Sequence, residues 1–146
     1  MNEQKIDWKE CCGKRIAKSV MPDIDTVESL KKSSENKIKS SDELKMNETT
    51  SVSKFILAYD SLREMLEALC LIFGYNVTNH ICLGELVKDL IKNFDYVSFD
   101  RFRYVRNGIN YYGKKIGFED GKEIIRKIFE MRKVIKKEVN VRIMHK

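Results

Sequence analysis

The fold is decided by one stretch of the sequence, residues 51–73, which reads SVSKFILAYDSLREMLEALCLIF. Its apolar side chains recur at spacings of three and four residues, and they are Val52, Phe55, Ile56, Tyr59, Leu62, Leu66, Leu69, Cys70 and Phe73. Residues at these spacings lie on one face of an α-helix, so the pattern predicts a helix with a wide apolar face. Such a face is expected of a helix at the centre of a bundle, and Gly74 supplies a signal for its end.

Outward from this helix, the same periodicity predicts further helices over about residues 4–20, 25–46, 79–94, 98–116 and 119–141. No convincing strand or repeat is visible, and the connecting segments are short. Short loops place consecutive helices side by side in opposite directions, so the predicted fold class is all-α, an antiparallel bundle of four to six helices. The length of 146 residues suits one domain. Pro22 divides it into an N-terminal helix within residues 1–22 and a bundle over residues 23–146.

Several classes of protein are disfavoured by the composition. The chain has no run of about 18 apolar residues, so no segment is predicted to span a membrane, and its N-terminus lacks the apolar core of a secretory signal. The four cysteines, at positions 11, 12, 70 and 82, have neither the spacing of a metal site nor that of a disulfide framework. We therefore expect buried, reduced thiols in a cytoplasmic protein that holds no metal and no cofactor.

The positive charge of the chain is concentrated in its C-terminal third. Residues 98–146 carry 14 basic and 6 acidic side chains, a net charge of +8, whereas the whole chain carries +6. A localised basic field can attract a polyanion such as RNA. The alternative, a solvated helix face in a lysine-rich protein, is equally compatible with the pattern.

The helix predicted over about residues 98–116 has an unusual second face. Its predicted inner face carries Phe99, Phe102, Val105, Ile109, Tyr112 and Ile116, and the last four of these define the expected core direction. Asn107 then points away from the core, Arg103, Asn110 and Tyr111 point within about 60° of it, and Arg106 lies at the boundary. A plain solvated face more often carries lysine and glutamate, so this composition favours an interface or a polar site.

The stretch Arg106-Asn107-Gly108-Ile109-Asn110-Tyr111-Tyr112-Gly113 resembles the signature of the HEPN superfamily (higher eukaryotes and prokaryotes nucleotide-binding domains). That signature is an arginine, usually followed by asparagine, and a histidine four to six residues after the arginine. The segment of residues 58–69 also resembles the central helix of the family. Helix order and loop lengths agree as well, so the resemblance covers most of residues 20–140.

The resemblance implies a helical bundle that forms a homodimer through the motif-bearing helices. Many members are metal-independent endoribonucleases, often toxins encoded beside a minimal nucleotidyltransferase antitoxin. By analogy, Arg106 stabilises the charged transition state at the RNA phosphate, and Asn107 positions groups by hydrogen bonding. No histidine follows at the required spacing, and Tyr111 is its nearest replacement. A tyrosine hydroxyl has an ordinary pKa near 10, so it is a poor base at neutral pH and only weak cleavage is expected.

Other polar residues are candidates for binding substrate. On the outward face these are Arg103 and Asn110, and on the central helix they are Asp60 and Glu64, which would flank Arg106 and orient it. The alternative for the two carboxylates is a charged rim beside the apolar stripe. His80 is a further alternative as the proton-transfer group, although a lone histidine near a helix start is more often a surface or partly packed residue.

Two functions remain open from the sequence. The first is a dimeric, RNA-directed protein in which Arg106, Asn107 and Tyr111 of both subunits line a shared cleft. The second is a non-catalytic HEPN bundle that uses the same cleft to bind a nucleotide, RNA or a partner nucleotidyltransferase. A purely structural helical dimer or an unrelated bundle is the remaining alternative.

Overall fold

The computed structural model of the protein describes residues 6–144, with the exception of the side chains of residues 110–112. Six helices and two short strands follow one another in this part of the chain: α1 (Trp8–Gly13), β1 (Ala17–Ser19), α2 (Ile24–Glu43), α3 (Ser51–Ile72), β2 (Tyr75–Val77), α4 (His80–Leu90), α5 (Tyr96–Tyr112) and α6 (Phe118–Met144). The predicted all-α helical bundle is thus confirmed.

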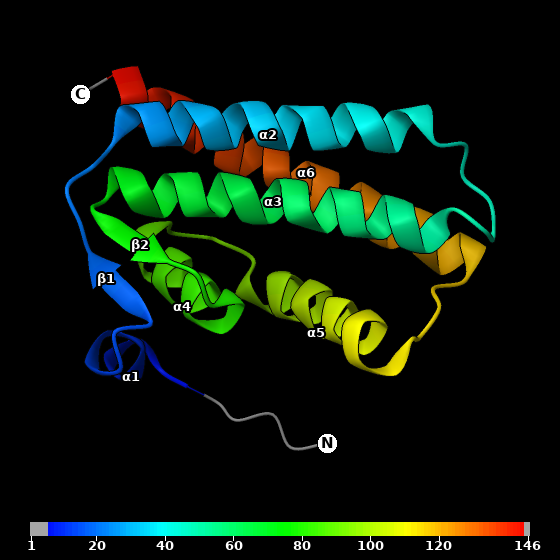
Figure 1. Ribbon diagram of the computed structural model, residues 1–146, viewed down its shortest axis with the longest axis horizontal. Coiled ribbons are helices and arrows are strands. Elements are labelled where there is room, and N and C mark those ends of the chain that lie inside the picture. Colours follow the sequence, from blue (N-terminus) through cyan, green and yellow to red (C-terminus); the bar gives the residue numbers. More distant parts are fainter. Residues whose placement is uncertain (1–5, 145–146) are drawn as a thin grey trace.

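Helix α3 forms the centre of the bundle. The long helices α2 and α6 pack along it, and the shorter helices α4 and α5 lie on its other side (Figure 1). The side chains of α3 that are fully buried are Phe55, Ala58, Tyr59, Leu62, Met65, Leu66, Ala68, Leu69 and Cys70. The wide apolar stripe predicted for residues 51–73 is therefore explained by the position of α3, which has neighbouring helices on several sides.

The N-terminal segment differs from the helix predicted over about residues 4–20. Helix α1 is short, and Arg15 follows it in the left-handed region, with φ of 57°. The chain then forms β1, which pairs antiparallel with β2 and places Ala17 opposite Val77. The prediction that the chain has no strand is therefore wrong for this small sheet, because pairing over such a separation leaves no trace in local periodicity.

The thiols also differ from the prediction of four buried, reduced cysteines. Cys11 in α1 and Cys82 in α4 form a disulfide, with their Cα atoms 5.8 Å apart. Cys12 is an exposed thiol, and Cys70 is the buried free thiol that was expected. The sequence gives no local signal for the disulfide, because 71 positions separate its two cysteines. The disulfide removes part of the basis for a cytoplasmic location, which stays a prediction.

A buried polar layer joins the three long helices. Arg132 of α6 is 4% exposed, and it donates hydrogen bonds from Nε to Ser34 Oγ at 2.8 Å and from Nη2 to Glu35 Oε1 at 2.9 Å. Ser34 of α2 in turn donates from Oγ to the carbonyl oxygen of Ser61 in α3 at 2.6 Å. One arginine therefore connects α6 to α2 and, through Ser34, to α3.

The close contact between α4 and α5 depends on Gly84. A Cβ atom at this position would lie 3.0 Å from two ring atoms of the buried Phe99 and 3.3 Å from Tyr96. We expect Gly84→Ala to lower the free energy of unfolding by about 1–3 kcal/mol, although alanine is the better helix former. Urea unfolding measures this loss. In Gly117→Ala the new Cβ meets nothing within 4 Å, so this control should unfold like the wild type, and equal losses in both variants would contradict the packing argument.

Candidate functional site

The face that α5 turns toward the bundle agrees with the prediction at Phe99 and Phe102, which are buried as expected, and differs from it at the arginines. Asp95 begins the helix by accepting a hydrogen bond from the Ser98 amide at 3.0 Å. Phe99 and Phe102 are each 1% exposed, and they share their face with Arg103 and with Arg106, whose side chain is 16% exposed. Two arginines can lie on this inward face because carboxylates lie within reach of them.

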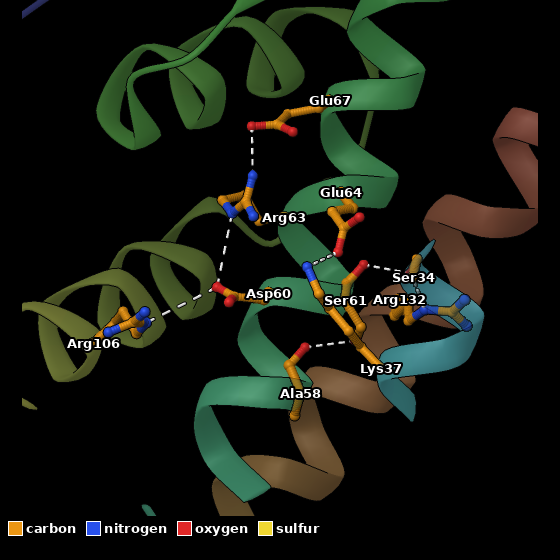
Figure 2. Close-up of polar contacts among 10 residues, drawn as sticks. All are labelled: Ser34, Lys37, Ala58, Asp60, Ser61, Arg63, Glu64, Glu67, Arg106 and Arg132. Atoms are coloured by element: carbon orange, nitrogen blue, oxygen red, sulfur yellow. Dashed lines mark hydrogen bonds and ion pairs between the residues drawn. The ribbon is translucent and has the colours of Figure 1, made fainter. Parts of the chain in front are cut away.

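Arg106 faces the central helix and joins a row of alternating charges. Its Nε lies 3.9 Å from Asp60 Oδ1, and Arg63 Nε lies 3.8 Å from the same oxygen. Arg63 Nη1 then donates a hydrogen bond to Glu67 Oε1 at 2.8 Å. We call these four residues the charge row, and Figure 2 shows it running along α3 on the side that faces α5. Asp60 is thus placed beside Arg106, where it can orient the guanidinium.

Glu64, the other candidate carboxylate of α3, is not brought to Arg106. Its side chain is 6% exposed and forms a close ion pair with Lys37 of α2. In Figure 2, Lys37 approaches Glu64 from the side of α3 opposite to Arg63. The expectation that Glu64 flanks Arg106 is therefore wrong. Glu64 lies one helical turn after Asp60, but it pairs with Lys37 of α2 and not with a residue of α5.

Arg103 is buried and not part of an outward polar face. It is 5% exposed, and its Nε and Nη2 both donate to Asp100 Oδ1, at 3.1 Å and 2.9 Å. The prediction placed it outward because Val105 and Ile109 were taken to mark the core direction. Both of those residues are only half-buried, whereas Phe99 and Phe102 mark the true core direction. The charge of Arg103 thus contributes to the site from inside the bundle.

A tyrosine–histidine pair beside the charge row was not predicted. Tyr59 Oη and His80 Nδ1 are 2.9 Å apart and hydrogen bonded. Burial lowers the pKa of His80 to about 4, the positive charge of Arg63 adds to this effect, and the charge of Asp60 opposes it. Burial likewise raises the pKa of the fully buried Tyr59 above its ordinary value. The sequence signal for this pair was His80 itself, which was an alternative proton-transfer group on sequence grounds, and nothing in the sequence indicated Tyr59 as its partner.

Asn107 lies on the other side of α5, where it lines a groove. The groove has a volume of about 570 Å³ and lies between the C-terminal half of α5, the following loop and the start of α6. Val105, Ile109 and Ile124 form apolar parts of its lining, and the groove is also lined by Arg101, Tyr104, Asn107, Lys114 and Lys115. Arg106 and Asn107 are adjacent in sequence, yet one lies toward α3 and the other on the groove.

The remaining candidates, Asn110 and Tyr111, belong to the last turn of α5, and their side chains lie outside the described residues. Gly113 follows in the left-handed conformation with φ of 59° and ends the helix there. Asn110 occupies the helix position one turn after Arg106.

Neither a metal site nor a membrane segment is found in the described part of the chain. Over residues 6–144, no three side chains of the metal-binding types gather into one group. In the same range, no helix combines the length and the apolar character needed to cross a membrane.

Comparison of the chain with protein-family models, with curated proteins and with solved structures finds no match. The class of protein is therefore defined here by its fold and by the side chains of its candidate site. The class is an all-α bundle whose central helix α3 and neighbouring helix α5 share a row of alternating charges.

Proposed function

We propose that this protein is a HEPN-type, RNA-directed protein that acts as a homodimer and cleaves RNA weakly without a metal ion. Arg106 binds the phosphate at the cleavage site and stabilises the charge that develops there, Asn107, on the groove side of α5, positions the RNA by hydrogen bonding, and Tyr111 stands in for the motif histidine. Such a protein would serve as a toxin component paired with a minimal nucleotidyltransferase.

One observation carries the proposal. The two segments that resemble the family, residues 58–69 and residues 106–113, are 37 positions apart from end to start in the sequence but meet in space. Their point of contact is the ion pair in which Arg106 Nε lies 3.9 Å from Asp60 Oδ1. A guanidinium held in this way has a defined direction before substrate arrives, which is what stabilisation of a transition state requires.

The outer side of α5 supports the homodimer. Val97 is 78% exposed and Tyr104 is 59% exposed, and both lie opposite the face that carries Phe99 and Phe102. Exposed apolar and aromatic side chains on one helix face are typical of a surface that another protein covers. A second copy docked there would bring two Asn107 side chains toward one shared cleft.

The test is RNA cleavage by the purified protein in EDTA, which inactivates metal-dependent contaminants. Arg106→Ala is expected to reduce the cleavage rate at least about 100-fold, because a preorganised charge at the reacting phosphate is lost. Tyr111→His is expected to raise the rate by up to about 100-fold, because a histidine is a better proton acceptor at neutral pH.

The control is Arg126→Ala, which removes an exposed arginine of α6 that pairs with Glu123 and Glu130. It should cleave like the wild type. Absence of cleavage by the wild type, or full activity in Arg106→Ala, would rule out the proposed reaction. Light scattering on the same preparations measures the dimer.

Binding without cleavage is a second candidate function, and the groove beside Asn107 favours it. A volume of about 570 Å³ suits a nucleotide-sized ligand. The charged residues of its lining are Arg101, Lys114, Lys115 and Asp120, so positive charge is in excess there. RNA, a free nucleotide or an acidic surface of a partner nucleotidyltransferase would each meet complementary charge there. Binding of a fluorescent RNA oligonucleotide that stays intact in EDTA would favour this function over the first.

A further inference from the structure

The outer face of α6 gathers exposed apolar side chains in its C-terminal half. Six large apolar side chains are exposed among residues 6–144, and three of them are Val134 at 59%, Val141 at 46% and Met144 at 83%. The opposite face of the same part of α6 packs into the bundle through Ile135 and Val139, which are fully buried. The exposed three follow one another at intervals of seven and three residues, so they form one stripe on the outside of the helix. Single exposed apolar residues are ordinary, whereas a stripe of them indicates a surface that another molecule covers.

Two exposed lysines lie on the same side of α6 as this stripe. They are Lys133 and Lys137, and neither forms an ion pair with any residue that the structure describes. The neighbouring Lys136, by contrast, pairs with Glu35 of α2. We call the surface formed by these lysines and the apolar stripe the outer patch, and its residues are Lys133, Val134, Lys137, Val141 and Met144.

The N-terminal half of the same helix face has a different character. There Arg126 forms ion pairs with Glu123 at 2.7 Å and with Glu130, and Lys127 lies 3.9 Å from Glu123. The charges of that half therefore satisfy one another along the helix. The outer patch contains no carboxylate, so its positive charge is available to a partner.

The spacing of the outer patch selects the kind of molecule that fits it. Val134, Lys137, Val141 and Met144 follow one another at intervals of three, four and three residues, which are the intervals of the seam between two helices packed side by side. The face by which a helix enters a membrane surface typically carries tryptophan, phenylalanine or leucine, and the outer patch has none of them. A second copy of this chain would bring lysine against lysine, which disfavours self-association through this surface.

We infer that the outer patch binds an amphipathic helix of another protein, with an apolar seam flanked by aspartate or glutamate. The seam packs against Val134 and Val141, and the carboxylates pair with Lys133 and Lys137. The outer patch extends along about three turns of α6, or about 18 Å, so the interface is small and the binding is weak and reversible. Neither the groove nor the charge row shares a residue with it, and the inference therefore does not depend on RNA cleavage.

The probe is a fluorescent synthetic peptide of four heptads with leucine at both seam positions and glutamate at the flanking positions. Repulsion between its glutamates at neutral pH keeps it from pairing with itself. Fluorescence anisotropy during titration with the full chain measures binding. We expect a Kd on the order of 10 μM, weakened about 10-fold in about 0.5 M salt. The same peptide with lysine in place of glutamate should not bind.

Two double variants test the two parts of the outer patch. Lys133→Glu with Lys137→Glu reverses its charge and is expected to weaken binding of the acidic peptide at least about 10-fold. Val134→Ser with Val141→Ser removes apolar contact area and is expected to weaken it about 10-fold. All four residues are exposed, so the variants should fold, and their circular dichroism spectra and thermal unfolding check that they do.

The matched control is Lys32→Glu with Lys39→Glu, which makes the same change in net charge at two exposed lysines of α2. It should bind the acidic peptide like the wild type. Absence of binding by the wild type, equal binding of the lysine peptide, or equal weakening in the control overturns the inference.

Two further titrations identify a different occupant. The first uses a fluorescent single-stranded RNA oligonucleotide, and the second uses vesicles that contain phosphatidylserine. If the variant Lys133→Glu with Lys137→Glu weakens either of these and leaves binding of the acidic peptide unchanged, the outer patch belongs to that ligand and the inference is overturned. RNA cleavage in EDTA should be the same in this variant and in the wild type, so a failure of the proposed cleavage leaves the peptide result intact.

Discussion

Reduction of the disulfide between Cys11 and Cys82 is expected to lower the free energy of unfolding by about 4 kcal/mol. The disulfide closes a loop whose ends are 71 positions apart, and it ties α1 to α4 around the hairpin of α2 and α3. Such a loop restricts the unfolded chain strongly, and the stabilisation grows with loop length. Urea unfolding, followed by circular dichroism with and without a phosphine reductant, measures the difference.

Two variants separate the disulfide from the other thiols. The double variant Cys11→Ala and Cys82→Ala should have the stability of the reduced protein and should no longer respond to reductant. Cys12→Ser changes the exposed neighbouring thiol and should respond to reductant like the wild type. The prediction would be contradicted if the wild type had the same unfolding midpoint with and without reductant.

The variant Arg132→Ala is expected to be less stable than the wild type by about 3 kcal/mol. Arg132 is 4% exposed, so its removal leaves a cavity in the interface of α2, α3 and α6. It also removes the hydrogen bonds to Ser34 and Glu35. Loss of one partner from a buried polar layer costs more than the layer contributes in net stability, because the other polar groups remain buried. Urea unfolding at pH 7 measures the loss.

The pH dependence of this loss provides a check on its cause. Lys136 and Arg132 hold the pKa of Glu35 at about 2, below its ordinary value of 4.5. The stability gained from the ionised Glu35 is complete above about pH 4.5 and is lost as the pH falls toward 2. The difference between Arg132→Ala and the wild type should therefore be smaller at pH 3 than at pH 7. Arg126→Ala, an exposed arginine of the same helix, should unfold like the wild type at both values.

The apolar periodicity of the chain was sufficient to predict the bundle. Residues 51–73 carried a stripe wide enough for a helix with neighbours on several sides, and α3 is that helix. The same reasoning failed at the N-terminus, where β1 interrupts the predicted helix. A three-residue strand is specified by its partner β2, which is distant in sequence, and not by its own pattern.

The candidate site was predicted only in part, and the reason is visible on α5. Phe99 and Phe102 were expected on the inner face and are buried, but Val105 and Ile109, which were expected there too, are only half-buried, so the expected core direction was turned away from the true one. An arginine counts as polar in any periodicity analysis, so the burial of Arg103 could not be read from the pattern. The carboxylate of Asp100 that accompanies it is a short-range signal that hydropathy does not register.

The sequence by itself determined the all-α class, the central position of α3 and the presence of a helix that carries Arg103 and Arg106. These features depend on residues within a few positions of one another, which is the range over which helical periodicity acts. Tertiary structure alone decided that Cys11 meets Cys82, that Arg106 meets Asp60, that Glu64 turns to Lys37, and that Tyr59 meets His80. Each of these pairs joins separate elements, and which side chains meet there is set by the packing of one helix against another.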